Sequence, residues 1–166
     1  MAKIETFKQL LVHELAALMS VEEQLLEVLP KLAKVASSAK LQKALLDHLE
    51  ETQKQLQRLE KAAEVLEMKK SDRKLCKAMK GLLAEGQETV ESIPPGPLRD
   101  AAIIAACQRV EHYEMAAYGT ARAFAEQLEE TDVSRLISET FKEELAADQL
   151  LTRLAEAEVN SQAQNV

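Results

Sequence analysis

The sequence predicts an all-α protein, folded as an up-down four-helix bundle with one short additional helix in the crossover between the second and third long helices. Of the 166 residues, 4 are Gly, 4 are Pro and 3% are aromatic, whereas strong helix formers are abundant. Four long stretches carry apolar residues at alternating spacings of three and four, which is the spacing of one helix face. We expect a single domain over residues 1–158 and a polar, frayed tail over residues 159–166.

The charge balance argues against some classes of partner. Lys and Arg number 21 and Asp and Glu number 28, so the net charge of −7 disfavours general binding to nucleic acid or to an anionic membrane. There is no charged-then-apolar leader and no unbroken apolar run of about 20 residues, so we expect a cytoplasmic protein that does not span a membrane. The basic stretch between Lys69 and Lys80 fits a solvated helix face, with docking of an acidic partner as the alternative. Cys76 and Cys107 show no CxxC spacing and fit small core residues.

The first helix is predicted over Ile4–Ala36, and its inward face is apolar except at Glu22. Pro30 falls inside this pattern and should kink the helix near its end. The pair Ser37-Ser38 breaks the pattern, and either serine suits the N-cap of the next helix. One carboxylate therefore lies midway along an otherwise apolar face.

The second helix is predicted over Ala39–Glu67, and its inward face becomes polar midway along its length. His48 and Glu51 lie three residues apart there, and therefore on the same side. A shorter helix is expected over Arg73–Glu91, capped by Asp72. A connection of this length can cross the end of a bundle or run along it.

The third long helix is predicted over Ala101–Leu128, after the breaker PPGP, whose last proline, Pro97, suits the first helical turn. Glu111 and Glu114 lie in the middle of its apolar face. A second face carries small side chains and His112, so we expect either the short helix or a second subunit to cover it. The small residues of this face are Ala101, Ala105, Ala116, Gly119 and Ala123.

The fourth long helix is predicted over Asp132–Glu158, with Glu144 at the middle of its apolar face and Asp148 one turn further on. No Lys or Arg occupies the central inward positions of the four long helices. Because an ionised carboxylate in an apolar interior loses several kcal/mol of solvation, these acids need another source of positive charge.

Antiparallel packing of consecutive helices would bring these acids to matching depths. Glu22 and Glu51 lie at nearly equal distances from the turn between the first two helices, and Glu114 and Glu144 lie likewise about the last turn. Carboxylate oxygens with an imidazole suit iron or manganese, and bridging carboxylates hold two ions close together. We therefore expect two iron ions, or alternatively manganese, bound in the bundle. The candidate metal ligands are Glu22, His48, Glu51, Glu111, Glu114, Glu144 and Asp148.

Five segments carry a resemblance to a known family: VEEQLLEVLPKLA, KALLDHLEETQKQLQRLE, KLCKAMKGLLAEG, DAAIIAACQRVEHYEMAAYGT and FKEELAADQLLTRLA. They resemble the YciE/YciF-like stress proteins of the ferritin-like superfamily, and the likeness runs from about Thr6 to Ala155. The resemblance implies a ferritin-like four-helix bundle with an extra helix, a metal site in the bundle, homodimers and an association with bacterial stress responses.

Residue by residue, the resemblance places six of these seven side chains at the metal site, and Asp148 matches a recurring acidic position of the family. The wider superfamily's Glu-x-x-His motif is absent, because His48 precedes Glu51 and Ala147 stands where the His of the last helix would be. Ala17 and Met19 stand where relatives often carry Asp and Tyr.

Two hypotheses for function follow. In the first, a dinuclear iron or manganese centre has ferroxidase activity or reduces a small oxidant, oxygen or peroxide, during stress. In the second, the protein is a non-enzymatic, dimeric structural or interaction protein whose metal site is structural or vestigial. A homodimer through the third long helix is expected in both. A third interpretation of the buried acids is a polar network held by shared protons and water, without metal.

Overall fold

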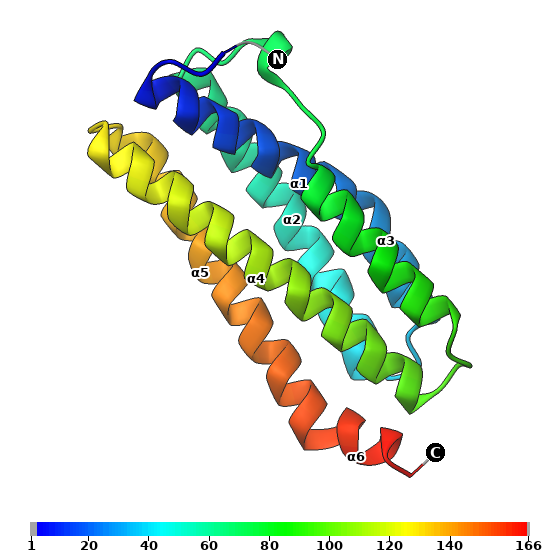
Figure 1. Cartoon of the computed structure of the whole chain (residues 1–166). Helices are drawn as coiled ribbons and strands as arrows, with labels where there is room; N and C mark the ends of the chain where they lie inside the picture. The colour runs from blue at the N-terminus through cyan, green and yellow to red at the C-terminus, as the bar shows by residue number, and fades with distance from the viewer. Residues whose placement is uncertain (1–2, 166) are drawn as a thin grey trace.

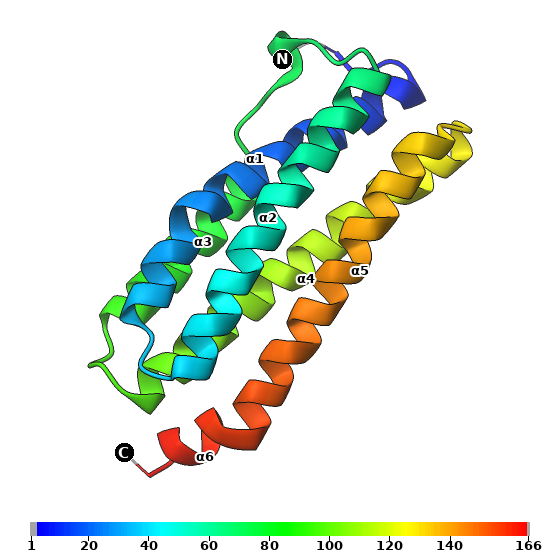
Figure 2. The ribbon, with the colours of Figure 1, turned by 180° about the vertical axis from the view of Figure 1, so that it is seen from behind.

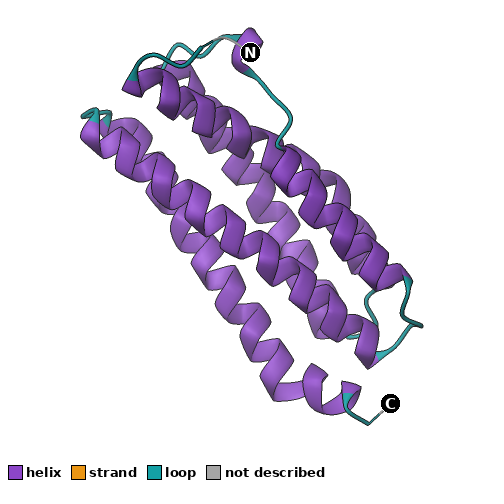
Figure 3. Cartoon of the chain, viewed as in Figure 1, coloured by secondary structure: helices purple, strands orange, loops and turns teal. Residues whose placement is uncertain are grey.

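The computed structural model describes residues 3–165, and every element in this range is helical (Figures 1 and 3). The all-α prediction is therefore confirmed. The helices are α1 (Phe7–Val35), α2 (Ala39–Val65), α3 (Lys77–Glu91), α4 (Pro97–Gln127), α5 (Thr131–Leu154) and α6 (Asn160–Ala163), together with the 3₁₀ helix η1 (Lys70–Asp72) and the π-helix η2 (Ala155–Val159).

Four long helices, α1, α2, α4 and α5, form the bundle, and neighbouring helices run in opposite directions (Figures 1 and 2). The two hairpins, α1 with α2 and α4 with α5, pack on each other through the pairs α1 with α4 and α2 with α5. Helix α3 lies outside this bundle, against α1 and α4. The up-down topology with an extra helix in the crossover is confirmed.

Local sequence signals account for most helix ends. The Ser38 hydroxyl accepts a hydrogen bond from the backbone N–H of Leu41, and Pro97 opens α4, both as predicted. Asp72 does not cap α3, because its carboxylate accepts the backbone N–H of Lys69 within η1, and α3 begins four residues later than expected, at Lys77.

The C-terminal segment also departs from the prediction of a frayed polar tail. After α5 the chain forms η2 and α6, which both contact α4. Val159 is only 2% exposed and belongs to the apolar core at this end of the bundle. Ala155 belongs to the same core cluster, and Lys40 of α2 forms an ion pair with Glu158, so several contacts hold the last turns against the bundle.

The core consists of two apolar clusters separated by a polar layer. Leu11, Leu15 and Leu18 belong to the cluster at one end, and Leu25, Leu29 and Ile104 belong to the cluster at the other. Between these clusters lie buried polar side chains from all four long helices. They are Glu22, His48, Thr52, Gln55, Glu111, Glu114, Thr140 and Glu144.

Asp100, which the sequence analysis does not single out, joins the two hairpins at one end of the bundle. Its side chain lies in the first turn of α4, and the residue is 2% exposed. The two carboxylate oxygens accept the backbone N–H groups of Ser37 and Ser38, each at 2.7 Å. This pair of charge-assisted hydrogen bonds fixes the loop between α1 and α2 against α4.

The predicted small-residue face of α4 is left largely open by α3. Gly86 of α3 approaches α4 at Ala106, where an added Cβ would lie 3.0 Å from the Ala106 Cβ, and this contact is on a different side of α4. Ala105, Ala116 and His112 are exposed in the single chain. Of the two expected covers for this face, the short helix is therefore excluded. None of the helices within residues 3–165 combines the length and apolarity needed to cross a bilayer.

Candidate metal centre

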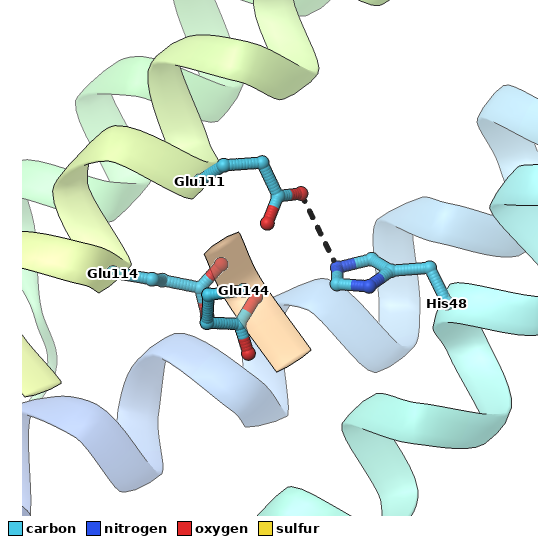
Figure 4. A group of neighbouring side chains, drawn as sticks. All are labelled: His48, Glu111, Glu114 and Glu144. Carbon is cyan, nitrogen blue, oxygen red and sulfur yellow. Dashed lines mark ion pairs between the residues drawn. The ribbon is translucent and has the colours of Figure 1, made fainter. Parts of the chain in front are cut away.

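Four of the predicted ligands converge at the centre of the polar layer (Figure 4). His48 comes from α2, Glu111 and Glu114 from α4, and Glu144 from α5. One ligand atom from each of these residues lies within 4.8 Å of the corresponding atoms of the other three. Two ligands bound at about 2.1 Å on opposite sides of an ion are about 4.2 Å apart, so side chains at this spacing can reach a shared ion with small adjustments.

The converging atoms are buried and lack hydrogen-bond partners. The exposed fractions are 8% for His48, 2% for Glu111 and zero for Glu114 and Glu144. Both carboxylate oxygens of Glu114 and both ring nitrogens of His48 have no hydrogen-bond partner among the described residues. His48 Nε2 does lie 3.4 Å from Glu111 Oε1, as an ion pair that is not a well-formed hydrogen bond. Since buried polar atoms in native proteins are nearly always paired, these unpaired atoms make the cluster a candidate site for a metal ion.

Burial disfavours the charged forms of these acids. Burial and the Glu144 carboxylate raise the pKa of Glu22 from 4.5 to about 8. Burial and the neighbouring acids likewise raise the pKa of Glu111 to about 8 and those of Glu114 and Glu144 well above their usual range. Burial lowers the pKa of His48, but the surrounding acids, Glu51 foremost, outweigh it and leave that pKa raised. Without a cation the cluster therefore retains protons that carboxylates normally release.

Tyr118 and Gln55 orient two of the acids. The Tyr118 hydroxyl donates a hydrogen bond to Glu22 Oε1, and Tyr118 is fully buried. Gln55 Nε2 donates to Glu144 Oε1 at 2.5 Å. Neither residue is among the predicted ligands, and the polar amide of Gln55 on the inward face of its predicted helix is the signal that could have identified it.

Arg58 extends this arrangement toward the surface. Its guanidinium forms two hydrogen bonds with the Glu143 carboxylate, at 2.6 and 2.7 Å, and so joins α2 to α5. The Gln55 amide lies 3.2 Å from the same carboxylate. Arg58 is therefore neutralised by Glu143 and does not supply the charge that the buried acids need.

The other three predicted ligands surround the central four. Glu22 is fully buried on α1, and its Oε2 has no hydrogen-bond partner among the described residues. Glu51 lies further out, with 44% of its side chain exposed and its Oε2 at 3.7 Å from His48 Nδ1. Asp148 faces α4, where its Oδ1 is 3.3 Å from His112 Nε2 and 3.2 Å from Gln108 Nε2. The structure therefore brings Glu22 into the polar layer and leaves Glu51 and Asp148 toward its edge.

Two cavities reach the polar layer at His48 and Glu111. One, of about 310 Å³, lies between α1, α3 and α4, and the other, of about 270 Å³, lies between α2, α4 and α5. His48, Cys107 and Glu111 line both. Cys107 is a buried free thiol, as expected for a small core residue, and burial raises its pKa to about 12. Both cavities therefore reach His48 and Glu111, whereas Glu114 and Glu144 are fully buried and line neither cavity.

An antiparallel four-helix bundle with inward carboxylates and a histidine on facing helices is the arrangement of ferritin-like bundles. The fold and the cluster therefore define this class, with a candidate metal centre in the core.

The chain belongs to the family described as a domain of unknown function, DUF892, whose profile matches residues 6–164. It is 43% identical over 162 residues to Protein YciF of Escherichia coli K12, an alignment that covers 98% of each chain. The resemblance to the YciF-like stress proteins is thus confirmed, and the chain is a homologue of that stress protein.

Solved structures agree with this assignment. The crystal structure of the E. coli stress protein YciF superposes with a TM-score of 0.90 and 43% identity, over 95% of this chain and 99% of that one. YcfI of Rhodopseudomonas palustris, described as a proposed structural protein, superposes with a TM-score of 0.86 and 40% identity, over 90% of this chain and 95% of that one. The two relatives therefore share the fold, while their descriptions point to different roles.

Proposed function

We propose that this protein binds two iron or manganese ions in the polar layer and uses them to reduce oxygen or hydrogen peroxide during stress. The observation that supports this proposal is the convergence of four buried ligand atoms within 4.8 Å, most of them without hydrogen-bond partners. Nitrogen and carboxylate oxygen are the donors that iron and manganese accept, and thiolate is not among the four. The homology to the stress protein YciF agrees with a role in stress.

Each residue has a role in this proposal. His48, Glu111, Glu114 and Glu144 would hold the ions together with Glu22, which contributes its carboxylate from α1. Tyr118 and Gln55 keep the Glu22 and Glu144 carboxylates in place through their hydrogen bonds. Glu51 and Asp148 lie at the edge, where their negative charge attracts an entering cation.

In this proposal the metal ions supply the electrons, and the chain supplies the ligands and a site from which bulk water is excluded. Two Fe(II) ions, each becoming Fe(III), would supply the two electrons that convert one hydrogen peroxide and two protons into two waters. Metal binding displaces the protons that Glu22 and Glu111 retain in the metal-free centre, so both carboxylates are charged when the ions are bound. The two apolar clusters exclude bulk water above and below it.

Anaerobic titration with Fe(II) or Mn(II), followed by elemental analysis, tests the binding step. We expect two ions for each chain, and we expect the Glu114→Gln variant to lose most of this binding. The matched control is Glu139→Gln on α5, where a half-exposed carboxylate pairs with Arg58 and Arg135 instead of facing the polar layer. Equal metal content in both variants would contradict the proposed site.

Peroxide consumption tests the reaction. In a single-turnover experiment the Fe(II)-loaded chain should consume one hydrogen peroxide for every two ions, and the Glu114→Gln variant should consume only what free Fe(II) consumes. If the loaded wild-type protein bound two ions but was no faster than that variant, the reaction would be refuted and the binding proposal retained.

A second candidate is a dimeric structural protein with a purely structural metal. The description of YcfI as a proposed structural protein favours it, and so does the exposed small-residue face of α4, which we propose as the homodimer interface. In this case metal would raise the melting temperature without peroxide turnover. Ala116→Arg, at the centre of that face, should then convert a dimer into a monomer in light-scattering measurements.

A further inference from the structure

The cavity between α1, α3 and α4 is apolar along most of its length. Its volume is about 310 Å³, and its walls include Val28 and Leu32 from α1, Leu82 and Leu83 from α3, and Val110 from α4. At about 30 Å³ for each water-sized atom, this volume accommodates a ligand of roughly ten non-hydrogen atoms. Pockets of this size and lining are typical sites for small organic ligands.

The cavity is elongated and ends at the polar layer. Arg99 and Glu111, both on α4, line its two ends, which places them about 18 Å apart along the helix at 1.5 Å per residue. His48 lines the inner end, where its ring nitrogens are without hydrogen-bond partners and the residue is 8% exposed. A ligand that fills the cavity would therefore touch the candidate metal centre.

The outer end is positively charged. Lys31 and Arg99 line it, and neither forms an ion pair with another side chain in the described part of the chain. Arg99 uses only its Nε, which donates to the Ile93 carbonyl at 2.7 Å, so its terminal nitrogens face no described acceptor. Glu91 also lines the cavity and carries one negative charge, so these three side chains together have a net charge of +1. Two available cations in a chain of net charge −7 favour an anionic head group here.

We propose that this cavity binds a medium-chain carboxylate of about ten carbons, whose carbon chain fills the cavity toward His48 and Glu111 and whose two carboxylate oxygens lie at the outer mouth, between Lys31 and Arg99. This inference goes beyond the proposed function, because binding depends on the apolar walls and the two cations and does not require metal. Where metal is bound, the end of the alkyl chain lies beside it.

Calorimetric titration of the whole chain with decanoate, below its micelle concentration, tests the proposal with and without Mn(II). We expect micromolar binding of one decanoate to each chain in both conditions. Acetate shares the head group and lacks the chain, and decyltrimethylammonium shares the chain and reverses the charge, so each should bind at least about tenfold more weakly. Equal binding of the cationic detergent would refute the role of the two cations.

Matched variants locate the site. Leu83→Trp fills the cavity and should weaken decanoate binding at least about tenfold, whereas Leu145→Trp, on an exposed position of α5 outside the cavity, should not. Val28→Phe serves as a second filling variant if Leu83→Trp fails to fold. Replacing Lys31 and Arg99 together by Gln should weaken binding, whereas Lys61→Gln should not.

The outcomes separate this inference from the metal hypothesis. Decanoate binding to the metal-free chain, lost in the filled variants, supports the inference even if no metal binds. If decanoate fails to bind and Leu83→Trp changes the oligomeric state, a second copy of the chain occupies the cavity and the inference is wrong. If decanoate bound Leu83→Trp and Val28→Phe as tightly as wild type, its binding site would lie outside this cavity. That result would also overturn the inference.

Discussion

Replacing Glu114 by Leu should stabilise the metal-free protein while abolishing its metal binding. Glu114 is fully buried, and neither carboxylate oxygen has a hydrogen-bond partner among the described residues. An unsatisfied buried polar atom costs about 1–3 kcal/mol, and Leu fills a similar volume without polar atoms. We therefore expect the free energy of unfolding to rise by about 2 kcal/mol, which for a chain of this size raises the melting temperature by roughly 4–8 °C.

The assay is thermal unfolding of wild type and variant after chelation, and again with saturating Mn(II). Metal should stabilise the wild type strongly and Glu114→Leu hardly at all, so the order of the two melting temperatures reverses. Glu139→Leu, on the exposed side of α5, is the control and should gain no stability in either condition. If Glu114→Leu melted below the wild type without metal, the Glu114 carboxylate would have stabilising partners and the argument for a missing cation would fail.

Three further predictions concern the scaffold and the entry of metal. Asp100→Ala removes the acceptors of the Ser37 and Ser38 N–H groups and should lower the free energy of unfolding by about 2–3 kcal/mol in urea denaturation; an unchanged midpoint would contradict this. Glu129, after α4, has a left-handed backbone conformation with φ 58°, which Gly adopts at a lower cost. Glu129→Gly should therefore raise the free energy of unfolding by about 1 kcal/mol in the same assay, and an unchanged value would contradict this. Glu51→Gln, at the edge of the second cavity, should slow Mn(II) uptake by about tenfold in stopped-flow mixing and leave the final metal content unaltered; lower metal content would make Glu51 a required ligand.

The four-helix arrangement could be predicted from sequence because apolar spacing, Ser38 and Pro97 are strong local signals that agree with the final packing. The start of α3 could not be predicted, because the Asp72 carboxylate accepts the backbone N–H of Lys69 in the preceding turn instead of capping α3. Helix periodicity does not indicate which of these two hydrogen bonds forms. The last turns were expected to fray because polar residues dominate there, yet the burial of Val159 depends on contact with α4, which is distant in sequence.

Most of the candidate centre could be predicted for the same reason as the fold, because both follow from the spacing of residues on helix faces. A carboxylate on an apolar helix face identifies Glu22, Glu111, Glu114 and Glu144 without any tertiary information. Spacing alone does not give the direction of a side chain at the margin of a face, so Glu51 and Asp148 were predicted beside the central acids and lie toward the edge. Arg58 lies off the apolar face, and its pairing with Glu143 follows only from the packing of α2 on α5.

The central claim, that the buried acids are arranged for a cation, is tested most directly by melting temperature as a function of pH and metal. In the metal-free protein the pKa values of Glu22 and Glu111 are about 8, whereas in the unfolded chain they return to about 4.5. The folded state therefore binds more protons across this window, and its stability is greatest below about pH 4.5 with respect to these groups and falls as pH rises toward 8.

Metal reverses this dependence because it replaces the protons. We predict that the melting temperature of the metal-free chain falls between pH 5 and 8, and that saturating Mn(II) or anaerobic Fe(II) raises it far more at pH 8 than at pH 5. A metal-free melting temperature that is constant or rises over this range, together with no response to either ion, would contradict the account.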